Sequence, residues 1–140
     1  MTRSIAAFAT ASLALLAACT TTQSGPAERL EGTAWRAASI ENTPAAESTP
    51  STLRFFDRQL AGGSLGCNAY STTYFADASG LRFGALAPTQ KTCAVPVMEQ
   101  ESRFTSALAE TRGLRLDPQG ALLLLDAEGR TRARLVPMTP

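Results

Sequence analysis

Three cysteines, Cys19, Cys67 and Cys93, carry the most reactive side chains in this chain of 140 residues. The chain contains no histidine. A serine or cysteine nucleophile therefore has no imidazole base, and a zinc site with a histidine ligand is excluded. Cys67 and Cys93 alone cannot supply a four-thiolate site. We therefore expect neither a metal nor a cofactor.

Carboxylates and one lysine are the remaining groups with catalytic chemistry. An enzyme would need a pair of acids or a serine–lysine dyad built on Lys91. Each aspartate, however, stands where a predicted strand meets a turn, which is the usual place of aspartate in β proteins. These residues are Asp57, Asp77, Asp117 and Asp126. We predict no catalytic residue and a non-enzymatic protein.

The segment Leu16-Ala17-Ala18-Cys19 resembles the lipobox of bacterial lipoproteins, in which the chain is cut before the cysteine and lipid is attached to its sulfur. The preceding apolar run, Ile5 to Ala18, is too short to cross a bilayer and is typical of an export signal. We expect a signal peptide over 1–18 and lipid attachment at Cys19. The alternative is an ordinary secretory signal that is cut elsewhere, with Cys19 incidental.

The rest of the chain divides into a tether and a folded domain. Residues 19–28 hold the lipidated cysteine and a small, polar segment with Gly25 and Pro26, and 29–137 form the domain. Thr20, rather than aspartate, follows the cysteine, which favours the outer membrane with the domain facing the periplasm. Removal of Arg3 with the signal leaves equal numbers of basic and acidic residues. This balance argues against nucleic-acid binding.

Cys67 and Cys93 are expected to form a disulfide. An exported chain enters an oxidising compartment, where two cysteines in one small domain usually pair. Such a bond stabilises a domain by roughly 3.5 kcal/mol for a loop of this size. The alternative is a reactive free thiol, for which Lys91, two residues from Cys93, is the sole activating neighbour.

Short alternating segments separated by turns predict a strand-rich domain. A glycine-rich passage lies between Asp57 and Tyr70. The predicted strands are 35–40, 52–57, 70–75, 81–86, 114–116, 121–125 and 131–136.

One helix is predicted near residues 96–111. Pro96 suits its first helical position, and Glu99 and Glu101 are expected in the early turns, where negative charge complements the helix dipole. Arg112-Gly113 is expected to close it with a left-handed cap. The apolar face comprises Val97, Phe104 and Leu108. Seven or eight short strands and one helix predict an α+β domain, mainly antiparallel, whose sheet wraps into a barrel around the helix.

These segments resemble the META domain family, which includes the HslJ-like heat-shock lipoproteins. The resemblance begins at Leu30–Trp35 and runs to the last strand. This chain has Ser71 and Thr72 where the family often has glycine. The most specific motifs are Gly66-Cys67-Asn68, Leu81-Arg82-Phe83-Gly84, Thr89 with Cys93, and Pro96-Val97-Met98-Glu99-Gln100-Glu101 leading to Phe104 and Leu108.

The resemblance implies a lipocalin-like, partly closed barrel and a role in envelope stress or antibiotic tolerance, without an established ligand. The motif residues have a sufficient structural interpretation. Gly66 permits a turn with positive φ, and Asn68 bonds its own backbone in that turn. Trp35 and Phe104 fill the core.

The first functional hypothesis is a monomeric, lipid-anchored accessory protein that binds a protein, peptide or lipid. Arg130, Arg132 and Arg134 alternate along the last strand, where they meet lipid phosphates or simply form a solvated face that blunts a sheet edge. The alternative is a lysozyme-inhibitor-like lipoprotein that blocks a wall-cleaving enzyme, because Ser79–Phe83 loosely resembles an inhibitory loop.

Overall fold

The computed structural model describes residues 29–139, so the predicted signal peptide, Cys19 and the whole tether lie outside the described residues. Within 29–139, no helix is long and apolar enough to cross a membrane. The elements are β1 (Ala34–Ile40), β2 (Thr43–Pro44), β3 (Thr52–Phe55), β4 (Leu60–Ser64), β5 (Ala69–Asp77), β6 (Gly80–Phe83), β7 (Ala87–Pro88), α2 (Val95–Glu110), β8 (Gly113–Leu116), β9 (Leu122–Leu125) and β10 (Thr131–Pro137).

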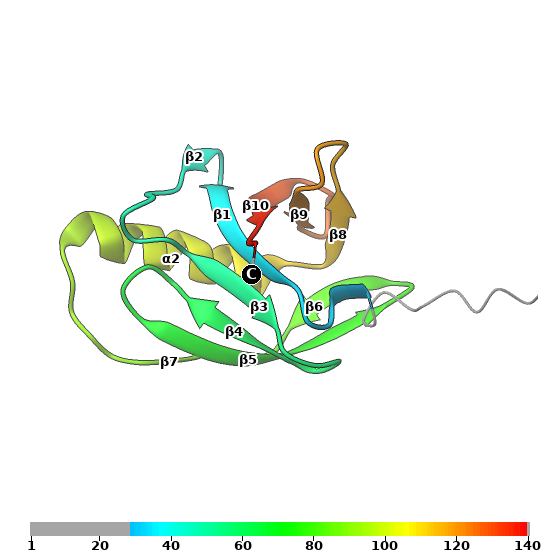
Figure 1. Cartoon of the computed structure of the whole chain (residues 1–140), viewed down its shortest axis with the longest axis horizontal. Helices are drawn as coiled ribbons and strands as arrows, with labels where there is room; N and C mark the ends of the chain where they lie inside the picture. Colours follow the sequence, from blue (N-terminus) through cyan, green and yellow to red (C-terminus); the bar gives the residue numbers. More distant parts are fainter. Residues whose placement is uncertain (1–28, 140) are drawn as a thin grey trace, which may run out of the picture.

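One antiparallel sheet runs in the order β6-β5-β4-β3-β1-β10-β9-β8, and the short strands β2 and β7 pair with β1 and β5 (Figure 1). Its two ends meet where the Leu81 amide donates to the Arg112 carbonyl at 3.2 Å. Gly80 is required at this seam. Its φ is +136°, and a Cβ there would lie 2.0 Å from the Arg112 oxygen. The predicted α+β, nearly closed antiparallel barrel is confirmed.

Helix α2 packs against β1, β6, β9 and β10 and fills the interior of this curved sheet. Its buried apolar residues are Phe104, Ala107 and Leu108. Phe104 meets Tyr70 edge to face, with ring centroids 6.4 Å apart. Trp35 is also buried, as predicted. The inward face of every long strand therefore packs on one common core.

Strand β4 was not predicted, because glycines hide its alternation. A Cβ at Gly62 would lie 2.5 Å from the Tyr70 carbonyl oxygen, and one at Gly63 would lie 2.4 Å from that of Thr52. The backbones of β3 and β5 therefore approach β4 too closely for any larger residue. Because Gly62 and Gly63 carry no side chains, the sequence of β4 shows no alternating pattern, although the segment forms a strand.

The predicted glycine cap of α2 is wrong. The helix ends at Glu110, Thr111 is extended, and Gly113 begins β8. Side chains satisfy the last carbonyls instead. The Thr111 hydroxyl donates to the Ala107 carbonyl at 2.7 Å, and the Arg112 guanidinium donates to the Ala109 carbonyl at 2.9 Å. No left-handed residue is needed where these bonds are made.

Candidate functional site

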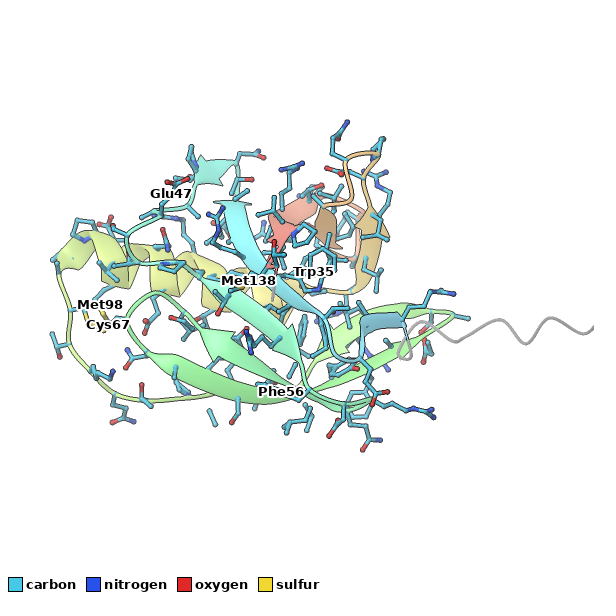
Figure 2. All side chains as sticks on the ribbon, viewed as in Figure 1. Trp35, Glu47, Phe56, Cys67, Met98 and Met138 are labelled. Carbon is cyan, nitrogen blue, oxygen red and sulfur yellow. A yellow bond between two sulfur atoms is a disulfide. The ribbon has the colours of Figure 1, made fainter. Side chains whose placement is uncertain are left out.

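The motif residues meet at the N-terminal end of α2. Cys67, in the turn between β4 and β5, forms a disulfide with Cys93, two residues before the helix, across a Cα–Cα distance of 6.2 Å. Figure 2 shows Cys67 beside this end of α2, near Met98. The pairing agrees with the prediction. It ties the β4–β5 turn to the segment that leads into the helix.

Glu101 faces inward from α2 and accepts three hydrogen bonds from the same turn. Its Oε2 accepts from the Asn68 amide at 2.8 Å and from the Cys67 amide at 3.2 Å, and its Oε1 accepts from Asn68 Nδ2 at 2.7 Å. Only 8% of Glu101 is exposed. A buried carboxylate must be satisfied in this way. Its role is to hold the turn, not only to complement the helix dipole as predicted.

The other hydrogen bonds of the Asn68 side chain are made with the segment before α2. Its Oδ1 accepts from the Thr89 hydroxyl at 2.9 Å and the Lys91 amide at 2.7 Å, and its Nδ2 donates to the Lys91 carbonyl at 3.1 Å. The predicted hydrogen bond of Asn68 within its own turn is therefore wrong. The side chain instead spans three segments, because both donors and both acceptors find partners in other elements. We call Cys67, Asn68, Thr89, Cys93 and Glu101 the motif cluster.

Gln100 extends this polar joint to the loop before β3. Its Nε2 donates to the Thr49 carbonyl at 2.8 Å and to the Ser51 hydroxyl at 3.0 Å, and its Oε1 accepts from the Ala46 amide at 2.7 Å. Sequence reasoning did not assign this role to Gln100. A usable signal was its spacing, since Gln100 falls three residues after Val97 and four before Phe104. Polar residues in such an apolar stripe are expected to be buried and bonded.

The other motif residues occupy separate places. Gly66 has a φ of +135°, as expected for the turn. Pro96 lies in the first turn of α2 and Phe104 is fully buried. Glu99 is exposed and takes no part in the motif cluster. Of the predicted motif residues, Asn68 and Thr89 therefore belong to the motif cluster, and Gly66, Pro96, Glu99 and Phe104 lie outside it.

The aspartates hold turns, as predicted. Asp57 Oδ1 accepts from the amides of Gln59 and Leu60 at 2.8 and 2.7 Å. Hydrogen bonds from the Ser79 side chain and backbone hold the pKa of Asp77 below its ordinary value. The amide of Ala121, aided by Arg134, does the same for the pKa of Asp117. These carboxylates are committed to backbone and guanidinium partners.

The arginines near the last strand are also paired. Arg132 contacts Glu41 and Glu110, Arg134 contacts Asp117, and Arg130 contacts Asp126 and Glu128. Arg130 lies in the turn before β10, and β10 has neighbours on both sides. The interpretation of this stripe as a face that blunts a sheet edge is therefore wrong. The acidic residues that pair with these arginines would compete with lipid phosphates for the guanidinium groups.

The segment that resembled an inhibitory loop is engaged in the seam of the barrel. Gly80 packs on the Arg112 backbone, and Leu81 is fully buried. A buried leucine and a glycine under another strand are not available for insertion into an enzyme. The segment is explained by closure of the sheet.

A groove of about 520 Å³ lies where β1 begins and β3 and β10 end. We call it the β1–β3 groove. It is lined by 32–35, 54–56 and 137–139. Its lining is mainly apolar, with Arg54 as its one charged residue. Figure 2 shows Trp35 and Met138 close together at this part of β1. Within residues 29–139, Arg54 has no ion-pair partner.

The described residues contain no group of histidine, cysteine, aspartate and glutamate able to hold a metal ion. The fold and the motif cluster together define a small α+β barrel domain, stapled by a disulfide and by a buried glutamate. A family model for the META domain matches residues 28–138, and the chain belongs to this family.

Two solved structures share the fold. One, described as an NMR structure of the protein from Burkholderia xenovorans, is 23% identical with a TM-score of 0.64, and covers 81% of this chain and 87% of its own. A second NMR structure is 22% identical with a TM-score of 0.61, and covers 78% and 91%. At these identities the likeness shows the fold alone. No curated protein matches the chain.

Proposed function

We propose that this META-domain protein is a non-enzymatic, lipid-anchored protein of the outer membrane that binds its ligand in the β1–β3 groove. The anchor is Cys19, and the domain faces the periplasm. An accessory role in envelope stress or antibiotic tolerance follows from the resemblance to HslJ-like lipoproteins. The observation that carries the binding proposal is an apolar groove whose one charged lining residue, Arg54, has no ion-pair partner among residues 29–139.

Glu101 and the aspartates are engaged in structural hydrogen bonds, which supports a non-enzymatic role. Glu101 is saturated by Asn68 and Cys67, and the aspartates each hold a turn. A carboxylate can act as general acid or base only where it can reach the proton of the substrate. The groove lining contains neither a carboxylate nor a thiol.

The geometry of the groove indicates the chemistry of its ligand. Ala34 pairs with Arg54 in the β1–β3 register, and the Met138 amide donates to the Ala34 carbonyl at 2.8 Å. The small Ala34 side chain thus lies between the longer Arg54 and Met138, which leaves a depression. Phe56 bounds the depression beyond Arg54. This arrangement fits an amphiphile with an apolar body and one negative group.

Anilinonaphthalene sulfonate, an apolar anion that fluoresces when it leaves water, tests this proposal. We expect saturable binding to the lipid-free exported chain, loss of binding in Ala34→Trp, and about tenfold weaker binding in Arg54→Gln, since a charged hydrogen bond contributes about 1.5 kcal/mol. Leu116→Ser, which removes an exposed apolar side chain far along β8, is the matched control. Equal binding by wild type and Ala34→Trp would contradict the groove as the binding site.

A further inference from the structure

Three large apolar side chains are exposed on the outer face of β3, β4 and β5. The exposed fractions of Phe56, Leu60 and Phe75 are 53%, 43% and 52%. The Phe56 amide donates to the Leu60 carbonyl, and Leu60 pairs with Thr73, two residues before Phe75. Because side chains alternate along a strand, Leu60, Thr73 and Phe75 share the outward face. We call Phe56, Leu60 and Phe75 the outer apolar patch.

Arginines surround this patch. Arg82 pairs with Phe75 in the β5–β6 register, and Arg54 precedes Phe56 by two residues on the same outward face. Arg58 lies in the β3–β4 turn, where it pairs with Glu31 at 3.6 Å. Glu31 pairs with Arg58, and Asp77 interacts electrostatically with Arg82. Apolar contact is therefore the main contribution, to which guanidinium groups add phosphate contacts. Exposed phenylalanines ringed by arginines are suited to the boundary between lipid headgroups and acyl chains.

The chain enters the domain beside this patch. The Gly32 amide donates to the Phe55 carbonyl at 2.8 Å, and Glu31 holds Arg58. Residues 20–28 separate Cys19 from Arg29. A tether of this length, as the sequence predicts here, would span about 17 Å as a random coil and roughly 30 Å when fully extended. A lipid on Cys19 would therefore hold this side of the domain close to the bilayer.

We propose that the outer apolar patch lies against the phospholipid surface of the membrane that holds the lipidated Cys19. This inference rests on the lipid anchoring proposed above. Phe56, Leu60 and Phe75 enter the headgroup region and Arg82 contacts a phosphate, whereas Arg54 belongs to the adjoining β1–β3 groove. The lipid anchor holds the domain at a high effective concentration next to the bilayer. A small patch that would bind lipid weakly by itself is therefore sufficient to orient the domain. The domain then has one preferred orientation at the membrane.

Bromine-labelled acyl chains test this orientation through fluorescence quenching. Full-length lipidated protein carrying Phe75→Trp is reconstituted in phosphatidylcholine–phosphatidylglycerol vesicles with and without brominated chains. The single native tryptophan, Trp35, is buried and gives the background in the wild type. Leu116→Trp is the matched control, because Leu116 is also exposed and lies in β8, away from the β3–β5 layer (Figure 1).

We expect brominated lipid to lower the added emission of Phe75→Trp at least twofold and to leave that of Leu116→Trp unchanged. Phe56→Trp provides a second reporter should the first variant fold poorly. Flotation with the vesicles is measured first for each variant. Protein that floats while the Phe75 and Phe56 reporters are no more quenched than Leu116→Trp would overturn the membrane-facing patch and leave the anchor intact. Protein that does not float would overturn the anchor, and the patch with it.

Discussion

The Glu101 carboxylate lies 2.8 Å from the backbone nitrogen of Asn68 and 2.7 Å from its side-chain Nδ2. Through this pair, α2 holds the same β4–β5 turn that the disulfide ties to the segment before the helix. Asn68 continues the connection to Thr89 and Lys91. The residues that look most like a reactive site are therefore a joint, in which one covalent and several hydrogen-bonded links fix the helix to the sheet.

Replacing Glu101 with alanine should destabilise the domain by about 3 kcal/mol. The substitution leaves the amides of Cys67 and Asn68 without their acceptor in a buried place, and unsatisfied donors cost about 1–3 kcal/mol each. Urea unfolding of the lipid-free chain measures this loss. Glu99→Ala is the matched control, because Glu99 is exposed on the same helix and should change stability by about 0.5 kcal/mol or less. Similar losses for both variants would show that the joint contributes nothing.

Serine at Cys67 or Cys93 should lower the free energy of unfolding by about 2–5 kcal/mol, the usual range for a small exported domain. The double substitution should cost about the same as either single one, because each removes the same bond. Thiol titration of the unfolded, unreduced Cys19→Ala protein from the periplasm, which carries no lipid, should find no free thiol. Two titratable thiols would instead support the reactive-cysteine alternative.

Most of the strands and the helix could be predicted, because their side chains alternate or recur at the helical period, whereas the order of the strands in the sheet was not predicted. Trp35 and Phe104 are recognisable as core for the same reason. Strand β4 could not, since Gly62 and Gly63 carry no side chain to reveal a pattern. Its existence depends on how closely β3 and β5 approach, which is a tertiary property.

The candidate site was predicted only in part. The cysteine pair and Asn68 stood out by type, but the partner of Asn68 is 33 residues away in sequence. Glu101 was assigned to the helix dipole, and Gln100 was assigned no role. The β1–β3 groove could not be found at all, because residues from both ends of the domain line it.

Alanine at Gly80 should open the seam of the barrel. The added Cβ would meet the Arg112 carbonyl oxygen at 2.0 Å, and φ is +136°. We expect a loss of more than about 2 kcal/mol in the free energy of unfolding and faster amide hydrogen exchange in β6 and β8. Gly113→Ala, next to Arg112, is the control, since its Cβ would make only ordinary contacts. Equal stability of the two variants would contradict the closure.

Acidification should lower the free energy of unfolding of the domain through protonation of Asp117. Hydrogen bonding by Ala121, joined by Arg134, holds its pKa below the ordinary value. The folded state therefore binds this proton less tightly than the unfolded state. Its stabilising contribution is complete above pH values near 4, the ordinary aspartate pKa, and is lost as pH falls through the lowered pKa.

Urea midpoints between pH 7 and pH 3 measure this dependence. The urea midpoint of Asp117→Asn should fall less steeply on acidification than that of the wild type. Glu47→Gln, in the exposed loop before β3, should keep the slope of the wild type. An unchanged slope in Asp117→Asn would show that the turn does not couple to protonation.

Metabolic labelling with a fatty-acid probe tests lipid anchoring most directly. The full chain and its Cys19→Ala variant are expressed in a two-membrane bacterium, labelled, and separated into soluble and membrane fractions. We predict that the wild type is labelled and recovered with the outer membrane, and that Cys19→Ala is unlabelled and remains as precursor or as soluble periplasmic protein. Equal labelling and membrane recovery of the two proteins would contradict the account.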